Sequence, residues 1–116
     1  MPIFEQGETV KVPFPYTDRS TRQRRPALVV SQGAVGENAA LLWVVMITSA
    51  ENRPWRGDLP LAGSQALAGL TAPSVIRPCK IATIEAADAE PLGRIAPGLL
   101  AQTTAALREI LGFEAP

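Results

Sequence analysis

Arginines gather in one polar segment of the chain, where their side chains could bind phosphate. Four of them fall within seven positions: Arg19, Arg22, Arg24 and Arg25. A guanidinium presents a planar fork of donors that matches phosphate oxygens. Arg25 directly precedes Pro26 and the apolar run 27–30, so we expect a rigid strand to fix its position. The segment indicates an anion clamp, although composition alone favours ordinary solvated loop charge.

Two adjacent hydroxyl side chains, Thr48 and Ser49, follow a second apolar run at 41–47. The end of a strand is a place where a rigid scaffold presents side chains to a ligand. Both hydroxyls could therefore hold a phosphate oxygen. The commoner role of such residues is to close the strand by bonding local backbone, and the sequence leaves both interpretations open.

A cation–aromatic–cation pattern follows, formed by Arg53, Trp55 and Arg56. Bases stack on aromatic rings while arginines hold the backbone, so the spacing fits single-stranded nucleic acid. Packing of Trp55 under its own loop explains the same pattern equally well. Further along, Arg77 and Lys80 bracket a Pro-Cys pair, which by itself indicates little.

The residues that are missing limit the chemistry more sharply. The 116-residue chain has no histidine and a single cysteine, Cys79. Ser-His-Asp catalysis, Cys-His catalysis and most zinc sites are thereby excluded. One cysteine cannot form an internal disulfide, so we expect a reducing compartment, the cytoplasm.

Overall composition is that of an ordinary globular chain, with 47% hydrophobic and 19% charged residues. The formal net charge of +0 argues mildly against nucleic-acid binding, although a local cluster can override it. The longest apolar run, 39–47, is much shorter than the roughly 18 residues of a membrane span. We also expect no secretory signal, because the amino terminus lacks a basic start and an apolar stretch.

Hydrophobic periodicity predicts many short strands followed by one helix, all within one domain at 1–116. The helix begins near Pro97 and ends before Gly112, residues that suit its first turn and its C-terminal cap. Mainly β structure with a C-terminal helix suggests a small barrel or curled sheet with the helix packed on it. The expected strands lie at 9–14, 27–31, 41–47, 58–61, 74–77, 81–84 and 92–95, with a break near Pro78.

The order of these segments along the chain resembles the MazF/PemK family of bacterial toxins. The most specific blocks are GETVKVPFPYTD at 7–18 and RRPALVVS at 24–31. ITS at 47–49, PSVIR at 73–77, KIATI at 80–84 and LGRI at 92–95 extend the resemblance over nearly the whole chain.

The resemblance implies a small SH3-like barrel with a C-terminal helix, usually a homodimer. Such proteins are toxins of type II toxin–antitoxin systems. They are endoribonucleases that need no metal or other cofactor and cut single-stranded RNA at short sequences. Each is paired with an antitoxin whose disordered tail occupies the RNA groove. Their catalytic arginine and threonine match Arg25 and Thr48 of this sequence.

The remaining candidates would bind RNA around the cut. They are Arg22, Arg24, Ser49, Arg53, Trp55, Arg77 and Lys80. One departure is that Cys79 stands where the Kid/PemK branch has an aspartate that is thought to act as a base. We interpret Cys79 as a small apolar filler at a strand break. The alternative is a partial thiolate that acts as a weak base.

Two other functions compete with RNA cleavage. CcdB-type toxins share the fold but inhibit gyrase by protein contact, with key residues at the chain end. This chain ends in GFEAP and lacks their Trp-Gly-Ile ending. A plain SH3-like peptide-binding domain ranks last, because the sequence has no acidic and aromatic groove pattern.

Overall fold

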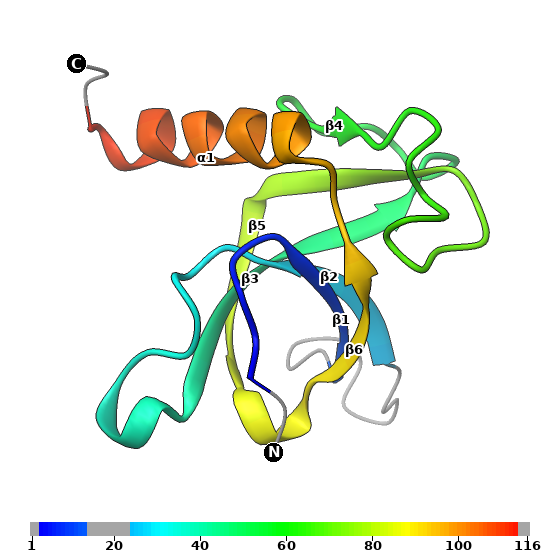
Figure 1. Ribbon diagram of the computed structural model, residues 1–116. Coiled ribbons are helices and arrows are strands. Elements are labelled where there is room, and N and C mark those ends of the chain that lie inside the picture. The colour runs from blue at the N-terminus through cyan, green and yellow to red at the C-terminus, as the bar shows by residue number, and fades with distance from the viewer. Residues whose placement is uncertain (1–2, 14–23, 114–116) are drawn as a thin grey trace.

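A computed structural model describes residues 3–13 and 24–113 of the chain. Six strands form one antiparallel sheet in the order β4-β5-β3-β2-β1-β6, with one helix after the last strand (Figure 1). The predicted fold class, mainly β with a C-terminal helix, is confirmed. The elements are β1 (Glu8–Pro13), β2 (Arg24–Val29), β3 (Leu41–Ser49), β4 (Leu59–Pro60), β5 (Ser74–Glu85), β6 (Glu90–Arg94) and α1 (Pro97–Leu111), with 3-10 turns at Glu37–Ala39 and Ala86–Asp88.

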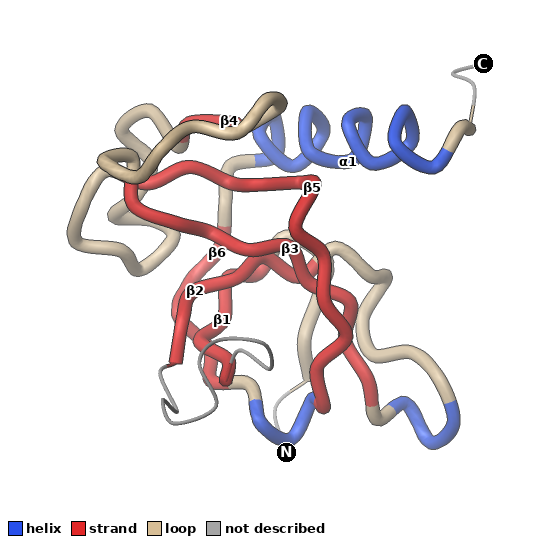
Figure 2. The backbone as a smooth tube through the Cα atoms, turned by 180° about the vertical axis from the view of Figure 1, so that it is seen from behind, coloured by secondary structure: helices blue, strands red, loops and turns tan. Residues whose placement is uncertain are grey.

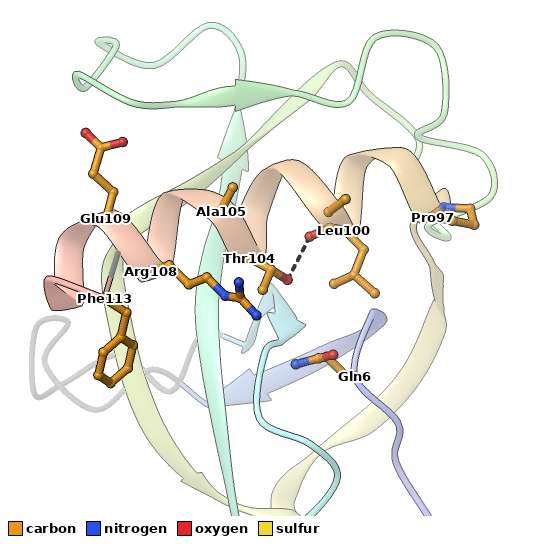
Figure 3. A pocket seen from close by; sticks show the side chains of 9 residues that line it. Gln6, Pro97, Leu100, Thr104, Ala105, Arg108, Glu109 and Phe113 are labelled. Atoms are coloured by element: carbon orange, nitrogen blue, oxygen red, sulfur yellow. Dashed lines mark hydrogen bonds between the residues drawn. The ribbon is translucent and has the colours of Figure 1, made fainter. Parts of the chain in front are cut away.

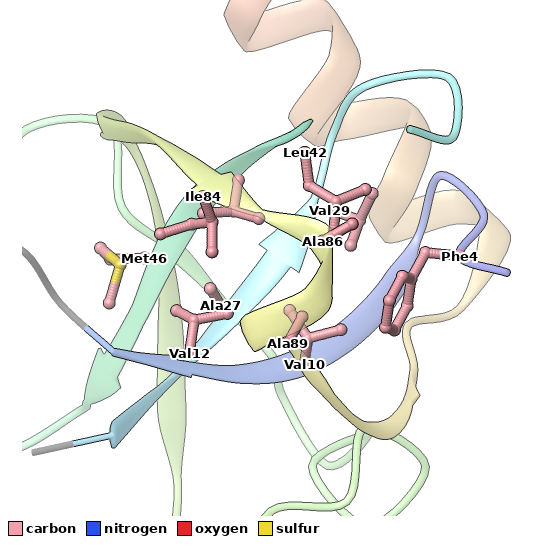
Figure 4. Close-up of a cluster of buried hydrophobic side chains, with 11 residues drawn as sticks. Phe4, Val10, Val12, Ala27, Val29, Leu42, Met46, Ile84, Ala86 and Ala89 are labelled. Carbon is pink, nitrogen blue, oxygen red and sulfur yellow. The ribbon is translucent and has the colours of Figure 1, made fainter. Parts of the chain in front are cut away.

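The sheet curls around one apolar cluster and carries a second on its other face. Side chains alternate between the two faces of a strand, so Val44 and Met46 of β3 enter the first cluster, whereas Val45 and Ile47 enter the second. Figure 4 shows the first cluster inside the curl. The second lies under α1, where Leu99, Leu100 and Leu107 pack against it.

The helix has one apolar face that meets the sheet, and its carboxyl half projects beyond the sheet (Figure 1). Gly112, at φ 83°, ends it in a left-handed cap, as the sequence predicts. The projecting end leaves three large apolar side chains exposed: Ile110 at 54%, Leu111 at 61% and Phe113 at 65%. Within the described part of the chain, no helix is long and apolar enough to cross a membrane.

Strand β5 is continuous, so the prediction of two strands broken near Pro78 is wrong. Met46 of β3 pairs with Arg77, and the preceding residue of β3, Val45, pairs with Ile81. Residues 78–80 thus form a bulge, and β5 turns a corner part-way along (Figure 2). Proline lacks a backbone N–H, and a bulge accommodates it without ending the strand.

Strand β2 begins earlier than the sequence indicates. Arg24 and Arg25 already belong to it, and they pair with Pro13 and Val12 of β1. The sequence places Arg25 just before this strand, but its pairing with Val12 of β1 places it within the strand. Its backbone is therefore held rigidly on the β1 side.

Candidate functional site

Six of the nine predicted site residues line one pocket of about 290 Å³, which we call the cationic pocket. They come from four separate parts of the chain: β2, the end of β3, the loop that follows β3, and β5. These six are Arg25, Thr48, Arg53, Trp55, Arg77 and Lys80, and Met46, Ile47 and Asn52 complete the lining.

Sheet register brings Arg25 and Thr48 together. Ala27 of β2 pairs with Met46 of β3 in antiparallel register. Continuing that register by two residues places Arg25 opposite Thr48, and directly opposed side chains share one face of a sheet. Both side chains are half-buried in the cationic pocket.

The Thr48 hydroxyl has a neighbour that sequence reasoning missed. Asn52 Nδ2 donates a hydrogen bond of 2.6 Å to Thr48 Oγ1. A hydroxyl carries one hydrogen and accepts through its lone pairs. Since the amide occupies a lone pair, the hydroxyl hydrogen can be donated to an anionic oxygen in the pocket. The four-residue spacing of Thr48 and Asn52 in a turn is a local signal that could have suggested this contact.

Trp55 presents part of its ring at the surface and rests against β5. The side chain is 42% exposed. The Arg77 guanidinium carbon lies 4.3 Å from the ring centroid, and Lys80 Nζ lies 5.6 Å from it. Cations at such distances are attracted by the aromatic face. The two cations that contact the Trp55 ring therefore both come from β5.

Arg77 is buried and its donors point into the protein. Its Nε and one terminal nitrogen each donate to the Asp58 carboxylate at 3.0 Å, and that nitrogen also donates to the Arg53 carbonyl at 3.0 Å. Only 8% of the Arg77 side chain and 10% of the Asp58 side chain are exposed. Arg77 thus forms a wall of the pocket, and Asp58 is a second residue that the sequence reasoning missed.

Two charged groups of the site, Asp58 and Lys80, have pKa values below their ordinary values. Burial by itself raises the pKa of Asp58. Hydrogen bonds from Arg77 and the Trp55 backbone N–H, together with the Arg77 charge, lower it by more than that, so the net pKa lies below 3.8. Burial and the charges of Arg77 and Arg25 lower the pKa of Lys80 below its ordinary value. The pocket is therefore strongly positive, which suits an anion.

Two of the described site residues, Ser49 and Arg24, do not line this pocket. Ser49 Oγ accepts a hydrogen bond of 3.2 Å from the Glu51 N–H, which is the local backbone role. Arg24 pairs with Glu90 at 3.2 Å and donates to the Asp88 carbonyl at 2.8 Å. Arg22 lies outside the described residues.

Cys79 is exposed and lies within the continuous strand β5, so its interpretation as a small apolar filler at a strand break is wrong. It lines a different cavity of about 670 Å³, which we call the apolar pocket, together with Trp43, Ile81, Leu107 and Phe113. Its Sγ lies 4.0 Å from the Arg56 carbonyl of the loop after β3, and Cys79 does not line the cationic pocket. The thiol is therefore not beside Arg25 and Thr48.

A third cavity, also of about 670 Å³, lies along α1 (Figure 3). Its lining includes Gln6, Leu100 and Thr104, whose hydroxyl donates to the Leu100 carbonyl at 2.9 Å. None of the predicted site residues lines it. Among residues 3–13 and 24–113, no group of three or more Cys, Asp or Glu side chains is placed to hold a metal ion.

A curled antiparallel sheet with one C-terminal helix is also the fold of solved MazF structures. The model of the family described as "PemK-like, MazF-like toxin of type II toxin-antitoxin system" matches residues 5–111. The chain belongs to this family, which confirms the resemblance seen in the sequence.

Solved structures show the same fold at low sequence identity. The chain is similar to a protein in the MazE-MazF crystal structure from Deinococcus radiodurans, with 23% identity, a TM-score of 0.76, and coverage of 98% of this chain and 100% of that one. An endoribonuclease in complex with its cognate antitoxin, from a mycobacterial species, has 20% identity and a TM-score of 0.74, with full coverage of both chains. No curated protein sequence matches the chain significantly.

Proposed function

We propose that this toxin is an endoribonuclease that cuts single-stranded RNA at short sequences without a metal. The observation that carries the proposal is the meeting of Arg25 and Thr48 in one cationic pocket with Arg53, Trp55 and Lys80. Cationic groups bind the phosphates of the chain, and an exposed aromatic ring accepts a base by stacking.

The reaction we propose is attack by the RNA 2′-hydroxyl on the adjacent phosphate. The 2′-hydroxyl gives its proton to solvent water and its oxygen bonds to phosphorus, while the bond from phosphorus to the 5′ oxygen breaks and that oxygen takes a proton from solvent. The products are a 2′,3′-cyclic phosphate and a 5′-hydroxyl. The Arg25 guanidinium, with its planar fork of donors, stabilises the phosphate oxygens and the leaving oxygen. Thr48 donates its hydroxyl hydrogen to a non-bridging oxygen.

The neighbours of this pair hold the flanking nucleotides. Trp55 stacks a base, while Arg53 and Lys80 neutralise phosphates. Contacts from Arg24 and Ser49 to RNA stay predictions, because these two residues do not line the cationic pocket. A contact from Arg22 stays a prediction as well, because Arg22 lies outside the described residues. Arg24 directly precedes Arg25 at the start of β2, so an RNA strand that leaves the pocket along β2 would reach it.

We further propose that the protein acts in the cytoplasm as a homodimer and is neutralised by an antitoxin with a disordered tail. The MazE-MazF complex and the mycobacterial endoribonuclease–antitoxin complex support the antitoxin partner. Exposed apolar side chains around the projecting helix end support the dimer, because contiguous apolar patches mark interaction sites. They include Trp43, Ile81, Ile110, Leu111 and Phe113.

Incubation of the purified protein with a long single-stranded RNA in EDTA tests the proposal. We expect discrete fragments with cyclic-phosphate and 5′-hydroxyl ends, and no cutting where the cut-site nucleotide is 2′-deoxy. Fragments with 5′-phosphates would show that water is the nucleophile and would overturn the mechanism. Intact RNA together with inhibited gyrase would favour the CcdB-type function.

A further inference from the structure

The geometry points to Asp58 as a positioning residue of the cationic pocket. Together with Arg77 it forms a brace that holds Trp55 at the angle needed to stack a base of the RNA. The inference rests on the proposed RNA-cleaving function. It also reassigns Arg77 from an RNA contact to a part of the brace.

The Asp58 carboxylate ties two segments together that are far apart in sequence. On one side it accepts hydrogen bonds from Arg77 of β5, one to each carboxylate oxygen, both at 3.0 Å. On the other side its Oδ2 accepts from the backbone N–H of Trp55 at 2.9 Å. Arg77 then reaches back to the same loop through the Arg53 carbonyl at 3.0 Å. The loop is thus fastened to β5 on either side of residue 54.

The brace decides where the Trp55 ring lies. Its backbone is held by Asp58, and its ring lies over the Arg77 guanidinium at 4.3 Å. Between residues 50 and 57, every side chain is exposed, so burial of apolar side chains contributes little to holding this loop. Polar contacts to β5 therefore carry its order, and a preformed platform binds its ligand without a further entropy cost.

A second ion pair in the molecule provides the matched comparison. Arg24 and Glu90 are joined by one contact of 3.2 Å, and their side chains are 36% and 60% exposed. Neither residue lines the cationic pocket. Exposed pairs of this kind contribute little to stability. Replacing Glu90 therefore removes one negative charge without loosening the pocket.

Charge and position predict opposite effects of replacing Asp58. Removing a carboxylate beside a site for RNA should strengthen binding if only charge matters, since RNA is a polyanion. Removing the brace should weaken binding if Asp58 holds the Trp55 platform. The sign of the change in affinity therefore separates the two explanations.

The experiment compares Asp58→Asn with Glu90→Gln in a Trp43→Phe background, which leaves Trp55 as the only tryptophan. We expect Asp58→Asn to raise KM for single-stranded RNA about 10-fold while kcat stays within about threefold, the size of one lost base stack. Acrylamide should quench Trp55 fluorescence more strongly in Asp58→Asn than in the background protein. Glu90→Gln should leave the quenching unchanged and should not raise KM.

Trp55→Ala provides a second route if Asp58→Asn does not fold. It should raise KM by a similar factor, and the double variant should be no worse than either single variant, because both changes remove the same contact. An unchanged KM in Trp55→Ala, or RNA binding by Asp58→Asn as tight as that of the background protein, would overturn the inference. A background protein that binds RNA but never cuts it would instead refute the proposed function, and the binding and quenching measurements would still test the brace.

Discussion

Two pockets lie on opposite sides of the bulge in β5, and they differ in chemistry. The cationic pocket takes Arg77 and Lys80 from this stretch, whereas the apolar pocket takes Pro78 and Cys79. The first holds about 290 Å³ among arginines, a lysine and polar side chains. The second holds about 670 Å³ between the sheet and the end of α1.

The difference shows how the four consecutive residues 77–80 line two separate pockets. In a regular strand, side chains alternate strictly between the faces. The bulge interrupts that alternation, so Arg77 and Lys80 reach the same pocket although they are three positions apart. The proposed RNA cleavage therefore takes place in the cationic pocket, and the proposed dimer contact is made separately, at the apolar pocket.

The largest expected effect is that of Arg25→Ala in the cationic pocket. We expect RNA cleavage to fall by about 100-fold or more, because removal of one preorganised charged donor costs about 3 kcal/mol of transition-state stabilisation. Arg94→Ala is the matched control, since Arg94 is an exposed arginine of β6 that does not line this pocket. Cleavage by Arg25→Ala at the rate of the Arg94→Ala protein would show that the assignment of this pocket is wrong.

The apolar pocket should respond to Ile110→Asp. A charge on this 54% exposed residue beside Phe113 and Trp43 would have to be desolvated in a dimer. We expect light scattering at micromolar concentration to give the mass of a monomer, against a dimer for the unchanged protein. Gln102→Asp, an exposed change on the same helix, should leave the dimer intact. A monomeric unchanged protein would contradict the dimer.

Acid should weaken the ion pair between Asp58 and Arg77. The pKa of Asp58 is lower in the folded protein than its ordinary value of 3.8, so folding favours the charged form. This contribution to the free energy of unfolding is present above pH 3.8 and is lost as the pH falls through the lowered pKa. Denaturant midpoints measured below pH 5 should therefore fall more steeply for the unchanged protein than for Asp58→Asn. Parallel curves would show that Asp58 is not the titrating group.

The smallest effect belongs to Cys79. Because the thiol lies on the apolar side of the bulge, we expect Cys79→Ser and Cys79→Ala to cut RNA within about twofold of the unchanged protein. A loss as large as that of Arg25→Ala, in a folded protein, would place the thiol in the chemistry. It would also contradict the separation of the two pockets.

Much of the site could be predicted because its signals are local. Arg25 precedes an apolar run and Thr48 follows one, so the strand ends alone mark both residues. Trp55 lies between Arg53 and Arg56, a spacing that already suggests nucleic acid. The helix limits followed from Pro97 and Gly112 for the same reason, since caps depend on neighbouring residues.

Apart from the local contact between Asn52 and Thr48, the contacts that the sequence reasoning missed join distant positions. Asp58 and Arg77 are 19 residues apart, and Arg24 and Glu90 are 66 apart. Nothing local distinguishes Asp58 from other loop carboxylates, or shows that Arg24 pairs with Glu90. The continuous course of β5 was equally hidden, because its pairing with β3 outweighs the local preference of Pro78 to end a strand.

By itself, the sequence determined the strand-and-helix pattern, the absence of histidine chemistry and the candidates Arg25 and Thr48, since composition and local periodicity suffice for these. Only the tertiary structure decided that Arg77 faces Asp58, that Arg24 pairs outside the pocket, and that Cys79 lines the apolar pocket. The physical reason is that side-chain direction and burial depend on sheet register and on the β5 bulge. Both are set by pairing between strands that are far apart along the chain.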